Sequence, residues 1–360
     1  MLDLRPSASA IWSQCDANPL FSSRVPPEPD SDASREGTCA AWLAELLLTG
    51  VVENGSEMTG KNHENGWVIT PDMVLLIERY VELVRSFGGD IHTERFVRLN
   101  RWIAGTPDSY AIVANGTLYV IDLKYGYAIV EPFQNTQISI YAGAIVRQLA
   151  SKGVTIKRVV IGVYQPRPWH PAGVYRTWSV YPEKLMEFVR TLEAAGERCQ
   201  NPNPVATPGT HCTYCPAKTT CHANAKMTYA VAEQCMSDQQ ANMKPVDLAQ
   251  ELEFLETAEA IITSRRKAVR AEATARVRKG EVLPGWHLEH PLGDRQFKAD
   301  LDVVQAVTGI EPYQKKPMTP AAVEKLSGVS AKAIAALTYR PHRPPVLKKI
   351  PGGYYENMFK

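Results

Sequence analysis

Residues 105–126 read GTPDSYAIVANGTLYVIDLKYG, and this stretch decides the fold. Two apolar runs flank an Asn-Gly pair at 115–116, the dipeptide most typical of a tight turn, so they predict a β-hairpin. Asp108 stands at the entrance to the first strand, and Asp122 and Lys124 stand near the end of the second. Because side chains alternate along a strand, Asp122 and Lys124 leave the sheet on the same face. Carboxylates are ligands that Mg²⁺ and Mn²⁺ accept, and a lysine beside such a metal can hold or help deprotonate a water molecule.

The turn decides whether these three polar groups meet. A strict two-residue turn pairs Asp108 with Leu123, which puts Asp108 on the wrong face of the sheet. A three-residue loop with Gly116 in the left-handed conformation pairs Asp108 with Lys124 instead, and the groups converge. We therefore expect a bulged turn, or Asp108 displaced from the strand end. The alternative is an ordinary hairpin whose charged ends are solvated.

The segment after the hairpin predicts a helix over residues 135–149, with Asn135 as its N-cap. Gln137 and Tyr141 are four residues apart and so share one face of that helix. Together the three motifs resemble those of RecB-like PD-(D/E)XK nucleases, which have GxxD, then (D/E)xK, then QxxxY. All three fall within 37 residues, which makes the resemblance specific. In this chain they are Gly105-Thr-Pro-Asp108, Asp122-Leu-Lys124 and Gln137-Ile-Ser-Ile-Tyr141.

This resemblance implies a restriction-endonuclease-like α/β core, with a central mixed sheet flanked by helices, and a deoxyribonuclease that uses Mg²⁺ or Mn²⁺. The two aspartates would hold the metal, with the carbonyl of Leu123 as a further ligand. Lys124 would position the attacking water and stabilise charge at the phosphate. Gln137 and Tyr141 would orient Lys124 or the DNA backbone. The most similar group is phage-encoded, so an exonuclease acting at DNA ends in recombination or replication is expected, with DNA and a single-strand-binding or annealing protein as partners.

A cysteine motif, HCTYCPAKTTC, occupies residues 211–221 and has the spacing C-x₂-C-x₅-C. Three thiolates need a fourth ligand, and both zinc and a 4Fe–4S cluster accept four. The resemblance selects Cys15 as the fourth and implies 4Fe–4S, because the family pairs one distant N-terminal cysteine with this spacing. Cys39 is the runner-up, although on a helix it is more often a small buried residue. The expected ligands are therefore Cys15, Cys212, Cys215 and Cys221, with Cys199 and Cys235 left out and His211 and His222 as neighbours.

Residues 36–48, EGTCAAWLAELLL, predict a helix that resembles the family's EGTxAHxxAE helix. That helix supplies a metal-binding histidine, but here Ala41 occupies the histidine position. Glu45 lies one turn later on the same face, and we expect it either to take over the ligand role or to be a solvated helix charge. The missing histidine motivates one alternative, a non-catalytic nucleic-acid-binding relative. A zinc-stabilised structural or interaction protein is the other.

Composition limits the remaining possibilities. The chain has 360 residues, 44% of them hydrophobic and 22% charged, which is ordinary for a soluble globular protein. A net charge of +2 means that any nucleic-acid surface must be local. No apolar run approaches the roughly 20 residues of a membrane span, and the N-terminus lacks the apolar core of a signal peptide. We therefore expect a cytoplasmic protein, where cysteines are more often metal ligands than disulfides.

Further periodic segments predict the rest of the core. We expect helices over 71–88 and 182–197, and strands over 92–99, 156–164 and 174–181. The first of these strands would pair with the hairpin. We favour His92 and Glu94 as surface charges of this strand, with their approach to the site as the alternative. The expected domains are an N-terminal segment 1–35 with a cluster cysteine, the nuclease core 36–200, the cysteine-cluster segment 201–240 and a helical extension 245–360.

A long helix is expected over residues 245–279. Its first half has apolar residues on one stripe, at Leu248, Leu252, Leu255 and Ile262. Its second half is basic and suits phosphate contact, with a solvated helix face as the equally weighted alternative. The expected DNA-binding residues there are Arg265, Arg266, Lys267 and Arg270.

Overall fold

Five strands form the central sheet of the computed structural model, in the order β1-β4-β5-β6-β7. β5 and β6 run parallel while the other neighbouring pairs run antiparallel, so the sheet is mixed, as predicted. A separate two-stranded ladder joins β2 to β3. The strands are β1 (Asp90–Thr93), β2 (Val97–Arg98), β3 (Ala104–Gly105), β4 (Ser109–Ile112), β5 (Thr117–Leu123), β6 (Arg158–Tyr164) and β7 (Tyr175–Val180).

The structure describes residues 2–26, 30–235, 244–284 and 286. The chain divides into two compact units, Met1–Leu288 and Glu289–Lys360, and the second unit lies outside the described residues. Most of the predicted helical extension 245–360, from residue 285 onward apart from residue 286, therefore lies outside the described residues. Within the described part of the chain, no helix has the length and apolar character needed to cross a membrane.

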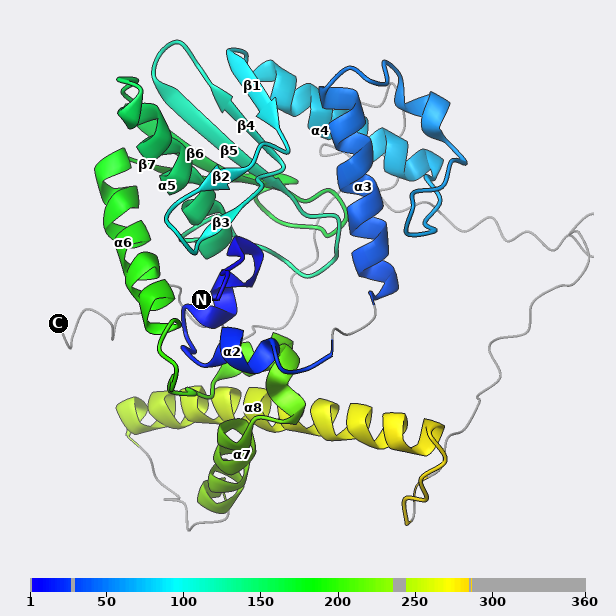
Figure 1. The fold of residues 1–360 in the computed structure, drawn as a ribbon, viewed down its shortest axis with the longest axis vertical. Coiled ribbons are helices and arrows are strands. Elements are labelled where there is room, and N and C mark those ends of the chain that lie inside the picture. Colours follow the sequence, from blue (N-terminus) through cyan, green and yellow to red (C-terminus); the bar gives the residue numbers. More distant parts are fainter. Residues whose placement is uncertain (1, 27–29, 236–243, 285, 287–360) are drawn as a thin grey trace, which may run out of the picture. The chain divides into compact units, whose positions relative to one another are not determined.

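Two pairs of helices cover the two faces of the sheet (Figure 1). One apolar core joins Ile121 and Leu123 of β5 to α3 (Asp32–Leu48) and α4 (Pro71–Ser86). The other core joins Leu118 and Val120 of β5 to α5 (Thr136–Ser151) and α6 (Pro182–Arg198). Side chains alternate along a strand, so β5 feeds both cores, and Asp122 belongs to the face that α5 covers.

The prediction of one continuous strand over residues 92–99 is wrong. The chain leaves β1 after Thr93, Glu94 adopts a positive φ of 45°, and β2 begins only at Val97. Two contacts to one carbonyl explain the turn: Thr93 Oγ1 donates to Asp108 O at 2.8 Å, and the Glu94 N–H donates to the same oxygen at 3.3 Å. β1 does pair with the hairpin, as predicted, and its end lies beside the entrance to β4.

The hairpin has the predicted three-residue loop but a different register. Val113 N–H donates to Thr117 O at 2.9 Å, which leaves residues 114–116 as the loop, and Gly116 has a φ of 86°. Ser109 faces Ile121, so one further step along the register places Asp108 opposite Asp122. The expected pairing of Asp108 with Lys124 is therefore wrong by two residues. Lys124 shares a face with Asp122 in either register, because the two residues are two apart along one strand.

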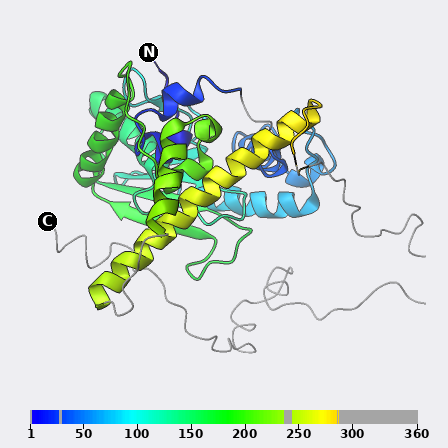
Figure 2. The same cartoon turned by 90° about the horizontal axis from the view of Figure 1, so that it is seen from below.

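Short helices at the N-terminus pack with the cysteine segment, and the long helix α8 lies against that segment and α7 (Figure 2). The predicted apolar stripe of α8 is not its packing face, since Leu248 is 59% exposed and Leu252 is 40% exposed. Ala258, Ile261 and Ala268 are the buried apolar side chains instead. These elements are η1 (Pro6–Ala8), α1 (Ser9–Trp12), α2 (Asn18–Ser22), η3 (Thr210–Tyr214), η4 (Pro216–Thr219), α7 (His222–Cys235) and α8 (Pro245–Arg278). One further short helix, η2 (Gly55–Met58), contacts α3 and α4.

Candidate functional site

Four segments meet at one end of the sheet: the end of β1, the entrance to β4, the end of β5 and the first turn of α5. Asp108 immediately precedes β4, Asp122 lies in β5, and Lys124 follows β5. The α5 helix begins here because Asn135 caps it, its side chain accepting the N–H of Ile138 at 3.2 Å. The topology therefore gathers side chains that are distant along the sequence.

Direct contacts join the predicted polar residues. Asp108 Oδ2 accepts the N–H of Leu123 at 2.6 Å, so this carboxylate reaches across to the neighbouring strand. Lys124 Nζ lies 2.7 Å from Asp122 Oδ2 and donates to Gln137 Oε1 at 3.3 Å. Asp122 is only 3% exposed, and its buried Oδ2 makes this ion pair without a well-aligned hydrogen bond. The structure thus brings Asp108, Asp122, Lys124 and Gln137 together.

Burial dominates the electrostatics of this group. Desolvation, followed by repulsion from Asp122, raises the pKa of Asp108 to about 8, against the opposing effects of Lys124 and the Leu123 N–H. Burial also raises the pKa of Asp122, and Lys124 opposes that shift. Desolvation by itself would lower the pKa of Lys124, but the two carboxylates outweigh it and raise the pKa. Lys124 is therefore a protonated side chain between two buried carboxyl groups.

Tyr141 completes the polar group from the second turn of α5. It is 5% exposed, and burial raises its pKa to about 12 while a hydrogen bond with Gln137 opposes the rise. Its ring also explains the glycine of the GxxD motif. A Cβ at Gly105 would come within 2.9 Å of Pro6 Cδ and 3.2 Å of Tyr141 Cε1, so a side chain there would collide. Lys124, Gln137 and Tyr141 form one connected series of contacts.

Glu94 is a site residue that sequence reasoning assigned to the surface. Its side chain is exposed, yet partial desolvation, followed by repulsion from Glu45, raises its pKa to about 7. Its charge also raises the pKa of Asp108, so the carboxyl group acts on the buried pair. The positive φ of Glu94 left no signal in the sequence, although an acidic residue where β1 meets the hairpin is a local hint. The repulsion between Glu45 and Glu94 places α3 at the same end of the sheet.

The donor set fits a divalent cation. Two buried carboxyl groups lie beside one lysine, and burial, followed by repulsion from Asp122, raises the pKa of Asp108, so a bound cation would favour ionisation of both. Asp122 Oδ2 is a buried oxygen with no aligned hydrogen bond, and hard oxygen ligands suit Mg²⁺ or Mn²⁺. Within the described ranges, no three His, Cys, Asp or Glu side chains are already gathered in the arrangement that a metal ion requires. Binding would therefore need side chains to rotate, Asp108 away from Leu123 first.

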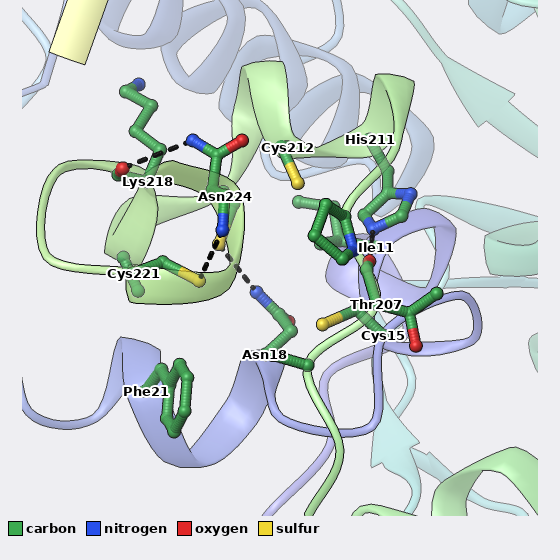
Figure 3. A pocket seen from close by; sticks show the side chains of 14 residues that line it. Ile11, Cys15, Asn18, Phe21, Thr207, His211, Cys212, Lys218, Cys221 and Asn224 are labelled. Atoms are coloured by element: carbon green, nitrogen blue, oxygen red, sulfur yellow. Dashed lines mark hydrogen bonds between the residues drawn. The ribbon is translucent and has the colours of Figure 1, made fainter. Parts of the chain in front are cut away.

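A second cluster joins the N-terminal helices to the cysteine segment. Cys15, Cys212, Cys215 and Cys221 line one pocket, and Figure 3 shows the sulfur atoms of the three labelled cysteines directed into the same space. Burial raises the pKa of Cys212, and the charges of the other three thiols add to that shift. Three of the sulfurs also accept N–H groups: Cys215 from Asn18 Nδ2 at 3.3 Å, Cys212 from Gly209 N at 3.4 Å and Cys221 from Asn224 N at 3.5 Å.

The other described cysteines lie elsewhere. Cys39 is fully buried in the core that α3 and α4 share, and Cys199 is buried where its thiol donates to Trp12 O at 3.5 Å. His211 lines the cysteine pocket, but its Nε2 is 2.9 Å from Thr207 O, consistent with a neighbour rather than a ligand. The side chain of Cys235 lies outside the described residues.

The predicted DNA-binding residues of α8 divide into two groups. Arg265 Nη1 donates to Thr219 O at 3.0 Å, so this side chain is held against the cysteine segment. Arg266, Lys267 and Arg270 are exposed. The structure therefore leaves three of the four predicted residues accessible and gives Arg265 a packing role.

A family model described as "Protein of unknown function (DUF2800)" matches residues 3–349. No curated protein matches the chain. The chain is similar to a solved structure described as "Putative exonuclease" from Eubacterium rectale, at 10% identity and a TM-score of 0.34, over 68% of this chain and 92% of that one. It is also similar to the structure of SSO0001, at 15% identity and a TM-score of 0.29, over 61% of this chain and 86% of that one. At these TM-scores neither likeness supports an activity.

Proposed function

The chain belongs to the DUF2800 family, and from the geometry of its polar site we propose that it is a metal-dependent nuclease of the PD-(D/E)XK type. One observation carries the proposal: Asp108 lies opposite Asp122 at the end of the hairpin, with Lys124 on the same face. Two buried carboxyl groups and a lysine cost stability wherever they are placed without a counter-charge. A functional site accounts for that cost, whereas a solvated hairpin end does not.

Each residue then has a role in phosphodiester hydrolysis. Asp108 and Asp122 would hold Mg²⁺ or Mn²⁺, with the Leu123 carbonyl and Glu45 as further ligands. When bound, the metal supplies a Lewis acid for the phosphate and lowers the pKa of a coordinated water. Lys124 is protonated, so its ammonium group stabilises charge that develops on the phosphate and orients the water through an N–H.

Two residues of α5 hold Lys124 in place. Gln137 accepts one N–H of its ammonium group at 3.3 Å, and Tyr141 hydrogen-bonds to Gln137 in turn. This leaves the remaining N–H groups of Lys124 for Asp122 and the substrate. Gln137 and Tyr141 therefore act through Lys124 as positioning residues, or contact the DNA backbone directly.

The substrate follows from the motif resemblance. An exonuclease that acts at DNA ends, in the manner of phage recombination nucleases, is preferred over a sequence-specific endonuclease. The exposed basic residues of α8, Arg266, Lys267 and Arg270, would contact phosphates.

The cysteine pocket would hold a 4Fe–4S cluster. Thiolates are the ligands of such clusters, and N–H groups directed at the sulfurs tune and stabilise them. Three of the four sulfurs already accept N–H groups in the pocket. A bound cluster would join Cys15 to the segment after α6 and so fasten the two ends of the core. Zinc is the alternative occupant, since it accepts the same four ligands.

Digestion of end-labelled linear DNA and circular DNA, with Mg²⁺, Mn²⁺ or a chelator, tests the activity. An exonuclease degrades linear DNA only in the presence of metal and spares the circle. Asp122→Asn should abolish digestion while the protein remains folded. Binding without cleavage in either metal would instead identify a non-catalytic relative, and neither binding nor cleavage, with zinc bound, would identify a structural protein.

A further inference from the structure

The loop from β1 to β3 is both basic and aromatic. It immediately precedes Asp108, and its β2–β3 ladder packs on α5. Phe96 is 59% exposed, so its ring is accessible for contact. The exposed basic residues of this segment are Arg95, Arg98 and Arg101.

Arginine and aromatic side chains are interleaved here. The guanidinium of Arg98 lies 5.6 Å from the centre of the Phe96 ring, and that of Arg101 lies 4.1 Å from the centre of the Trp102 ring. Each arginine is thereby held over a ring by cation–π attraction. One N–H of Arg98 donates to Arg101 O at 3.3 Å, which leaves further N–H groups of the guanidinium for a ligand. Interleaved arginines and exposed rings are the chemistry that binds phosphates and stacks bases.

The segment is rigid before any ligand arrives. Asn100 Oδ1 accepts the N–H groups of Trp102 at 3.1 Å and Ile103 at 2.9 Å, which fixes the turn. Arg147 of α5 donates to Leu99 O at 2.9 Å and so ties the turn to the helix. Arg147 also pairs with both oxygens of Glu193, at 2.8 and 2.9 Å, so it contributes support rather than free positive charge. A preorganised surface loses little entropy when it binds.

A cleft of about 420 Å³ lies between this segment and the C-terminal half of α5, lined by Phe96, Arg98, Arg147, Gln148 and Ser151. Its position relative to the polar site follows from the helix. Gln137 is at the site and Arg147 is ten residues further along α5, which corresponds to about 15 Å of helix rise. A stacked strand rises about 3.4 Å per nucleotide, so that distance spans about four nucleotides.

We propose that this cleft binds the backbone of single-stranded nucleic acid about four nucleotides from the bond that is cut, with Arg98 on a phosphate and Phe96 stacked on an unpaired base. This proposal rests on the proposed nuclease function, because it places the cleft on the path of a strand that leaves the polar site. Base faces are covered by their neighbours in a duplex, so an exposed ring for stacking selects an unpaired strand. The nearby carboxylate of Glu193 does not oppose this charge strongly, since it is paired with Arg147.

Fluorescence anisotropy with labelled single-stranded DNA, in a chelator so that no cleavage occurs, tests the proposal. The variants are Arg98→Ala, Phe96→Ala and Phe96→Leu, where leucine keeps the apolar volume but removes the ring. Arg79→Ala is the matched control, because Arg79 is exposed on α4, across the sheet. Thermal unfolding of each variant checks that the fold is retained.

A strand of about fifteen nucleotides should bind about tenfold more weakly to Arg98→Ala and to both Phe96 variants than to wild type or Arg79→Ala. Arg98→Ala should also reduce the steepness of the salt dependence by about 0.7, the amount for one lost phosphate contact on a single strand.

Unchanged binding of the long strand to the Arg98 and Phe96 variants would overturn the proposal. So would a Phe96→Leu variant that binds as wild type does, or wild-type preference for duplex over single strands of equal length. If wild-type protein digests DNA and the variants bind normally, the cleft assignment fails and the nuclease function stands. If wild-type protein binds the long strand through Phe96 and Arg98 but never cleaves, the nuclease function fails and the binding surface stands.

Discussion

Asp108 stands one residue before β4, at the position that continues the register opposite Asp122 of β5, and Asp122 belongs to the face of the sheet that α5 covers. In this arrangement one carboxylate bonds to the N–H of Leu123 and the other to Lys124. Two buried carboxyl groups this close cannot both ionise cheaply without a cation. Asp108 therefore holds a proton in the folded, metal-free protein up to a pH of about 8, which has consequences for stability as well as for chemistry.

The first prediction concerns the stability of the metal-free protein. The pKa of Asp108 rises from 3.8 to about 8 on folding, so between these values the folded protein holds a proton that the unfolded chain has lost. This group's contribution to stability is full below the lower value and is lost as pH rises towards the upper one. In a chelator, the melting temperature of Asp108→Asn should therefore be higher than that of wild type, and this difference should grow from pH 5 to pH 8.

Added Mg²⁺ should narrow that margin, because it binds and stabilises only the wild type. Asp72→Asn, an exposed carboxylate at the start of α4, is the control and should show no growing margin. A margin between Asp108→Asn and wild type that stays constant over this pH range would mean that the carboxyl group is not desolvated.

The second prediction concerns cleavage itself. Asp108→Ala, Asp122→Ala and Lys124→Ala should each reduce the rate by about 10³-fold or more, because all three act on one reacting phosphate. Their effects should not add in double variants, since residues that work as a unit fail together. Circular dichroism should show an intact fold in each. Wild-type rates for any one of them would remove it from the site.

Much of the site could be read from the sequence because its residues lie close together along the chain. Hairpin, lysine and helix cap follow local rules, which placed Asp122 and Lys124 on one face of the sheet, while the contact of Gln137 with Lys124 was expected from the family resemblance. The register was missed by two residues because turn propensity favours a loop without fixing the residue at which pairing resumes. Glu94 was missed because its role depends on a backbone turn that the tertiary contact with Asp108 O imposes.

The third prediction separates two kinds of arginine on α8. Charge reversal of Arg266, Lys267 and Arg270 together should weaken DNA binding and flatten its salt dependence, since about one counterion is released per phosphate contact. Arg265→Ala should leave the salt slope unchanged and lower the melting temperature, because Arg265 supports Thr219 O beside the cysteine pocket. Salt titration of binding, with thermal unfolding, distinguishes the two. A salt slope that depends on Arg265 but not on the other three would reverse the assignment.

The sequence could not separate these roles, because a helix of 34 residues presents basic side chains all round and periodicity does not say which face meets a neighbour. The same limit applied to the apolar stripe at Leu248 and Leu252, which proved to be exposed. Small residues such as Ala258 and Ala268 form the packing face because they allow the short helices to approach closely.

The fourth prediction concerns the cysteine pocket. Protein purified without oxygen should be brown and contain iron, and replacing Cys15, Cys212, Cys215 or Cys221 with Ser should bleach it and lower its solubility. Cys39→Ala and Cys199→Ala should keep the colour, since those thiols are buried in the two apolar cores. Metal analysis and visible absorption provide the measurement. A colourless wild type with stoichiometric zinc would replace iron by zinc at the same four ligands.

The last prediction concerns the helix that lacks the family's histidine. Repulsion from Glu45 helps to raise the pKa of Glu94 to about 7, so α3 presents a carboxylate to the site even though Ala41 offers no ligand. If Glu45 binds the metal, Glu45→Gln should weaken Mg²⁺ and Mn²⁺ binding and reduce cleavage, and it should also lower the pKa of Glu94 by removing that repulsion.

Ala41→His restores the missing imidazole one turn earlier on the same face of α3. It should tighten metal binding, and more so for Mn²⁺, which accepts nitrogen ligands more readily than Mg²⁺ does. Calorimetric titration of both ions, with carboxyl titration of Glu94 by NMR, measures these effects independently of cleavage. If Glu45→Gln shifts the Glu94 pKa but leaves metal affinity intact, Glu45 only tunes its neighbour. In that case Mg²⁺ would be held by the two aspartates, a backbone carbonyl and water, which its preference for retained waters permits.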